Sequence, residues 1–115
     1  MLRRNFFPVV ALIGTPLAAQ AAEPIDAQLA ELRKQIDDAD EQIVHWLNQR
    51  AEIVAEVVKI KKKANLPVTA PARERQVLER IADKGKSGLL SAEALQRIYK
   101  VIIGEMKDLE KNLPG

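Results

Sequence analysis

Four cationic side chains at regular spacings are the residues of this sequence best suited to chemistry. Lys61 lies 11 residues after Arg50, which on a helix is three turns plus about 20°, so both cations would share one face. Arg33 lies 17 residues before Arg50, roughly 100° away around the same helix. Arg73 follows a loop that contains two prolines. Four cations directed at one interior space favour a small dianion or a dicarboxylate as ligand.

Arg50 also interrupts an apolar stripe. Every seventh residue of this segment is aliphatic except the fourth, and the positions are Leu29, Ile36, Ile43, Arg50 and Val57. A guanidinium on a buried seam is costly unless an anion meets it. The alternative is that Arg50 snorkels to solvent or pairs with a neighbouring acid. Its placement on the same face as Lys61 favours a ligand.

The segment that must carry these cations is one very long helix. Residues 27–64 contain neither Gly nor Pro and predict a helix of about 57 Å, ended by the loop with Pro67 and Pro71. Because this length exceeds the roughly 26 Å diameter of a compact domain of this size, we expect a second copy to pack along it in an antiparallel, intertwined dimer. A partner helix running the other way would bring Arg33 to the site.

Two shorter helices should follow, so the predicted fold is all-α with three helices per chain. The first covers about residues 72–84, with Gly85 and Gly88 breaking it. Ser91 is typical of an N-cap and would begin a third helix that ends before Pro114. No segment shows the alternating pattern of a β-strand.

Composition excludes several kinds of site. The sequence has no Cys and a single His, which rules out disulfides, thiolate metal sites and multi-histidine metal sites. We therefore expect no metal site of these types.

The N-terminus is typical of an export signal. A basic start with Arg3 and Arg4, an apolar run and a small-residue pattern at residues 19–21 predict a signal peptide over residues 1–21, cleaved before a mature domain of residues 22–115. The paired arginines leave the Sec and twin-arginine routes both open. We expect the mature protein in the periplasm or secreted.

Cleavage would change the charge of the chain. Of the 18 basic residues, Arg3 and Arg4 leave with the signal, so 16 remain against 16 acidic ones. A neutral mature chain gives no support for nucleic-acid binding through a global positive field. No later segment is apolar for long enough to span a membrane, so we expect no membrane partner after cleavage.

Several of these segments together resemble the all-helical (type II) chorismate mutases. The similarity covers about residues 29–110 and rests on residues 31–40 (ELRKQIDDAD), 47–50 (LNQR), 58–61 (VKIK), 67–68 (PV) and 73–75 (RER). The spacings from Arg33 through Arg50 and Lys61 to Arg73 reproduce the family pattern. The resemblance implies an intertwined homodimer that rearranges chorismate to prephenate with two equivalent sites and no cofactor.

The resemblance also implies roles for single residues. Arg33 of the partner subunit and Arg50 would hold the two substrate carboxylates. Lys61 would hydrogen-bond the ether oxygen, with Glu110 facing the same atom. Glu74 would accept a hydrogen bond from the ring hydroxyl, and Arg73 would close the site.

Two positions depart from the family pattern, because Ala70 and Met106 stand where many relatives carry Asp and Ser. Recognition of the hydroxyl would then depend more heavily on Glu74.

Two alternative functions stay open for the same residues. One is an isochorismate pyruvate-lyase, which uses the same scaffold and nearly the same cations, and the other is a non-catalytic helical interaction module.

Overall fold

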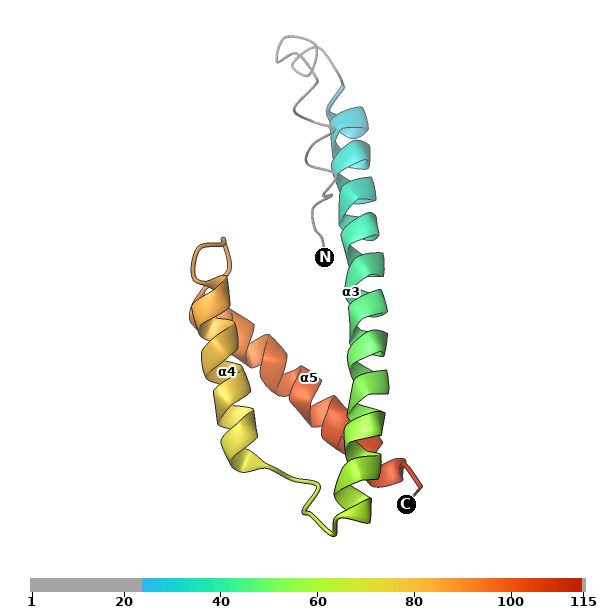
Figure 1. Ribbon diagram of the computed structural model, residues 1–115. Helices are drawn as coiled ribbons and strands as arrows, with labels where there is room; N and C mark the ends of the chain where they lie inside the picture. The colour runs from blue at the N-terminus through green and yellow to red at the C-terminus, as the bar shows by residue number, and fades with distance from the viewer. Residues whose placement is uncertain (1–23, 115) are drawn as a thin grey trace. The chain divides into compact units, whose positions relative to one another are not determined.

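The structure, a computed structural model, describes residues 24–114 (Figure 1). This part of the chain consists of the helices α3 (Ile25–Lys63), α4 (Pro71–Gly85) and α5 (Ala92–Asn112) and contains no strand. The prediction of an all-α fold with one very long N-terminal helix is confirmed. The predicted signal peptide, residues 1–21, lies outside the described residues.

The chain divides into two compact units, and the boundary falls within α3. The first unit ends at Leu47, and its described part is the N-terminal portion of α3. The second unit, Asn48–Gly115, contains the rest of α3 with α4 and α5. The buried hydrophobic residues of the described chain are Val58, Val77 and Met106. All three belong to the second unit, one on each helix.

Helix α3 ends in a left-handed turn at Asn65. The φ angle of Asn65 is 55°, and Asn is one of the few residues that adopt this conformation at low cost. The Leu66 N–H donates to the Lys61 carbonyl oxygen at 2.8 Å, and the Asn65 N–H donates to that of Lys62 at 3.2 Å. This pattern is a Schellman motif. The helix therefore closes before Pro67 is reached, and Pro71 is the first residue of α4, where its missing N–H costs nothing.

Helices α4 and α5 are joined by a short connection and pack against each other. Ser91 caps α5 as predicted, because its Oγ accepts a hydrogen bond from the Ala94 N–H at 3.0 Å. Gln96 Nε2 donates to the Leu78 carbonyl oxygen at 3.2 Å and so links the two helices. Leu95 lies so close to Gly85 that a Cβ there would meet its side chain. The far end of α5 is joined to α3, since Lys62 Nζ donates to the Leu113 carbonyl oxygen at 2.7 Å.

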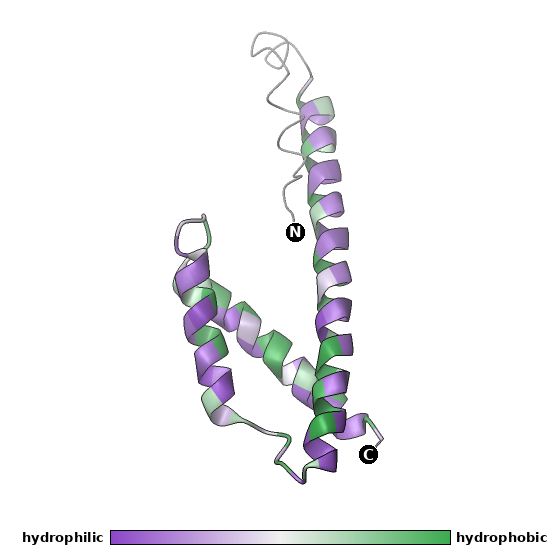
Figure 2. Cartoon of the chain, viewed as in Figure 1, coloured by the Kyte–Doolittle hydropathy of each residue, from purple (hydrophilic) through white to green (hydrophobic). Residues whose placement is uncertain are grey.

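The apolar stripe of α3 is uncovered in a single chain. Among its residues, all of which are described, only Val58 is buried. The aliphatic residues of the seam are between 41% and 58% exposed: Leu29, Ile36, Ile43 and Val57. Figure 2 shows hydrophobic residues recurring between polar ones along α3. Within residues 24–114, none of the helices combines the length and apolar character that crossing a membrane requires.

Candidate functional site

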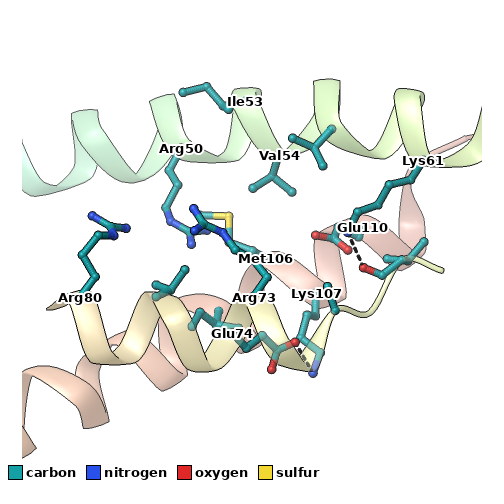
Figure 3. Close-up of a pocket in the computed structure, with 15 residues that line it drawn as sticks. Arg50, Ile53, Val54, Lys61, Arg73, Glu74, Arg80, Met106, Lys107 and Glu110 are labelled. Carbon is teal, nitrogen blue, oxygen red and sulfur yellow. Dashed lines mark hydrogen bonds and ion pairs between the residues drawn. The ribbon is translucent and has the colours of Figure 1, made fainter. Parts of the chain in front are cut away.

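A pocket lies within the second unit, where α3, α4, α5 and the loop after α3 contribute side chains (Figure 3). Its volume is about 290 Å³, close to the lower end of the roughly 300–1,000 Å³ range of small-molecule sites. The apolar part of its wall consists of Ile53, Val54, Val57, Val68, Ala70, Val77, Ile103 and Met106. The charged part consists of five cations (Arg50, Lys61, Arg73, Arg80 and Lys107) and two carboxylates (Glu74 and Glu110).

The excess of cations determines what the pocket can bind. Hydrophobic walls reduce the competition from water, so charges in such a space act more strongly than on the surface. Arg50 and Arg73 bring planar guanidinium groups, which match the two oxygens of a carboxylate. The pocket is therefore suited to a small ligand that carries more than one negative charge.

Lys61 is held by the loop that follows its own helix. Its Nζ donates to the Val68 carbonyl oxygen at 2.9 Å, and its side chain is partly buried. An ammonium group has three donors, so two remain for other acceptors in the pocket. The Schellman turn at Asn65 folds residues 66–68 back toward the last turn of α3, and this brings Val68 within reach of Lys61.

Glu110 presents an unsatisfied polar atom. Its Oε2 is buried, and no hydrogen-bond partner for it occurs in the described part of the chain. A buried polar atom without a partner is costly. Because Glu110 also lines the pocket, a ligand atom is a natural partner for this oxygen.

Glu74 is paired across the α4–α5 interface. Lys107 Nζ lies 3.3 Å from Glu74 Oε2, and the two side chains are 36% and 29% exposed. The dashed line beside Glu74 in Figure 3 marks this ion pair.

The structure brings five of the six predicted site residues together, namely Arg50, Lys61, Arg73, Glu74 and Glu110. Arg33 is exposed, belongs to the first unit, and is not among the residues that line the pocket of the second unit. Sequence reasoning missed two cations of the pocket, Arg80 and Lys107. The signal for Arg80 was its position seven residues after Arg73, which places both on one face of α4.

The described residues contain no group of three or more His, Asp or Glu side chains that could hold a metal ion.

The fold and the pocket define an all-helical protein with a cation-rich pocket in the described part of the chain. The chain belongs to the chorismate mutase type II family, whose family model matches residues 32–111. This match contains Arg33 and all five of the predicted site residues that line the pocket.

Individual relatives agree with this assignment. The chain is 44% identical over 89 residues to a bifunctional chorismate mutase/prephenate dehydratase of Aquifex aeolicus. The aligned stretch covers 75% of this chain and 25% of that protein. It is 30% identical over 84 residues to a chorismate mutase of Methanocaldococcus jannaschii. Here the aligned stretch covers 73% of this chain and 85% of that protein. The chain thus spans about a quarter of the bifunctional relative and most of the shorter one. No solved structure matches the chain.

Proposed function

We propose that this protein is a chorismate mutase, an isomerase that converts chorismate to prephenate by an intramolecular Claisen rearrangement for phenylalanine and tyrosine biosynthesis. Two findings support this activity: the chain belongs to the family, and it is similar to a chorismate mutase over 85% of that protein's length. The structural observation that carries it is that Lys61 and the unpaired Oε2 of Glu110 line one cation-rich pocket. The Lys61 ammonium and a protonated Glu110 carboxyl would each donate a hydrogen bond to the ether oxygen of the substrate.

The reaction needs electrostatics and orientation only. A carbon–oxygen bond breaks ahead of carbon–carbon bond formation, so negative charge develops on the ether oxygen in the transition state. Lys61 and a protonated Glu110 would stabilise this charge from two sides, and one such donor contributes about 3–4 kcal/mol. No proton transfer, covalent intermediate or metal takes part.

The remaining charged residues would hold the substrate in a reactive conformation. Arg50 and Arg33 of a second subunit would bind one carboxylate each as bidentate partners. Arg73 would close the site, and Glu74 would accept a hydrogen bond from the ring hydroxyl. These contacts hold the flexible enolpyruvyl arm over the ring, which removes much of the entropic cost of the rearrangement.

The contribution of Arg33 requires the antiparallel homodimer. Two features support such a dimer. The seam residues of α3 are 41% to 58% exposed, and a stripe of this kind is stabilised when a second copy covers it. In addition, the pocket of one chain lacks the fourth cation of the predicted set, which a partner helix would supply.

We also propose that residues 1–21 are a cleaved signal peptide and that residues 22–115 form the mature enzyme in the periplasm or outside the cell. The support is the basic start, the apolar run and the small residues before Ala22. Mass spectrometry of the protein recovered from the periplasmic fraction tests this directly. An intact N-terminus in protein from the cytoplasmic fraction alone would contradict it.

The decisive experiment is a spectrophotometric assay of chorismate loss by the purified protein, with the product identified by chromatography. Prephenate is the expected product. Salicylate and pyruvate formed from isochorismate would instead identify a lyase on the same scaffold. If neither substrate is consumed, the protein is a non-catalytic helical module.

A further inference from the structure

The ion pair between Lys107 of α5 and Glu74 of α4 differs from the other ion pairs of residues 24–114. The others join residues three apart on one helix or at its end, with 67% to 73% of each side chain exposed: Lys59–Glu56, Lys86–Asp83 and Lys111–Asp108. Exposed pairs of this type contribute little. Lys107 and Glu74 join two helices, are only 36% and 29% exposed, and both line the pocket.

Side-chain acceptors are scarce in the pocket, which makes the orientation of Glu74 important. The described residues that line it include no Ser, Thr, Asn, Gln or Asp. Glu74 and Glu110 are thus the only strong side-chain acceptors there, and in the proposed mechanism Glu110 is used at the ether oxygen. A hydroxyl group elsewhere on the ligand can donate only to Glu74 or to the main chain.

Glu74 would not hold a single orientation without a partner. Its side chain has several rotatable bonds, and three arginines line the same pocket and compete for its carboxylate: Arg50, Arg73 and Arg80. Lys107 binds Oε2. Because an ionised carboxylate accepts through both oxygens, this pairing leaves Oε1 available to a ligand hydroxyl.

The place of Lys107 in the fold suits this role. It follows Met106, which is one of the buried core residues, so the backbone from which Lys107 extends is fixed by packing. Its side chain bonds across to α4 and not to an acid on α5. The ammonium therefore has a defined position relative to Glu74.

We propose that Lys107 is a positioning residue that holds the Glu74 carboxylate in one orientation at the pocket, so that Glu74 selects ligands with a ring hydroxyl. This inference rests on the proposed function, because that function supplies the hydroxyl-bearing dicarboxylate. Lys107 acts through Glu74 and does not itself bind the substrate.

The first test replaces the charge of Lys107 and keeps the length of its side chain. Contacts to the hydroxyl exist in the ground state and in the transition state alike, so their weakening raises KM more than it lowers kcat. We expect Lys107→Met to raise KM for chorismate roughly two- to fivefold, as for a partly exposed ion pair, with kcat within about twofold. Lys107→Arg should keep the wild-type KM. Lys111→Met, one turn further along α5, is the matched control and should change neither constant.

The second test asks whether Lys107 acts through Glu74. In a double-mutant cycle with Glu74→Gln, the effect of Lys107→Met on KM should disappear, because residues that act as one unit are not additive. Binding of two cyclic dicarboxylate inhibitors that differ only in the ring hydroxyl gives a readout independent of turnover. Lys107→Met should weaken the hydroxyl-bearing inhibitor and leave the other unchanged.

The results separate this inference from the proposed function. A wild-type protein that does not convert chorismate and binds neither inhibitor overturns both. An active wild type whose KM is unchanged in Lys107→Met overturns the inference alone. Full additivity in the cycle, or equal weakening of both inhibitors, shows that Lys107 contacts the ligand directly and also overturns it. If Lys107→Met unfolds, Lys107→Gln, which retains a hydrogen-bond donor, is measured by the same criteria.

Discussion

Lys61 and Val68 are joined by a hydrogen bond of 2.9 Å from the lysine Nζ to the valine carbonyl oxygen. The main chain of Lys61 is held by the same loop, since its own carbonyl oxygen accepts from the Leu66 N–H at 2.8 Å. The loop after α3 thus restrains both the backbone and the side chain of the residue that we place at the ether oxygen. Such restraint keeps a charged group in position before the reaction begins, which is the condition for strong electrostatic stabilisation.

Replacing Lys61 should stop the chemical step while the fold is retained. We expect Lys61→Met to lower kcat by about 10²–10³-fold, as for the loss of one donor to a developing oxyanion. The lost bond to Val68 should cost only about 1 kcal/mol of the free energy of unfolding. Lys63→Met is the matched control in the same helical turn and should keep full activity. A kcat for Lys61→Met close to that of the control would remove Lys61 from the mechanism.

Replacing Arg50 should abolish turnover without unfolding the protein. Arg50 lies on the apolar seam of α3 and lines the pocket, and a seam charge costs stability unless a ligand meets it. We therefore expect Arg50→Ala to show no measurable kcat and an unchanged or raised thermal midpoint by circular dichroism. Arg75→Ala, an exposed residue of α4, should behave like wild type. Loss of folding with normal activity per folded molecule would contradict the assignment.

Sharing of the site between subunits predicts complementation. Arg33→Ala and Arg50→Ala should each be inactive alone. After subunit exchange, a mixed dimer has one site with both arginines intact, so an equal mixture should recover up to about a quarter of wild-type activity by random pairing. Exchange is verified by native mass spectrometry. Verified exchange without recovered activity would show that Arg33 and Arg50 do not meet in one site.

The role of Glu110 predicts that its amide analogue is active. A neutral group at this position donates a hydrogen bond to the ether oxygen, whereas a carboxylate repels the developing charge. Glu110→Gln supplies a permanent neutral donor of similar shape, so its kcat for chorismate should equal or exceed that of wild type. A correctly folded Gln variant without activity would mean that Glu110 is not the donor.

Much of the fold was predictable because helix signals are local. The lack of Gly and Pro over residues 27–64 and the cap at Ser91 predicted helix ends within two residues of those of α3 and α5. The left-handed turn at Asn65 that closes α3 was not predicted, since the sequence analysis attributed the end of this helix to the two prolines that follow. The shared face of Arg50 and Lys61 could be predicted from their spacing because both residues lie on one helix.

The part of the site that escaped prediction depends on packing between helices. Lys107 meets Glu74 only because α5 lies against α4, and no periodicity in the sequence relates residues 33 positions apart on different helices. Arg80 was overlooked although it lies seven residues after Arg73, on the same face of α4.

The single buried residue of α3 has a consequence for how this protein must be handled. Because only Val58 among the residues of α3 is buried, the free energy that keeps the N-terminal part of this helix folded has to come from association in the proposed dimer, as in obligate homodimers. The fraction of the protein that is folded and active then depends on the protein concentration. Specific activity should fall on dilution and return on reconcentration, and chorismate, which would bind across both subunits, should shift the midpoint of this loss to lower concentration.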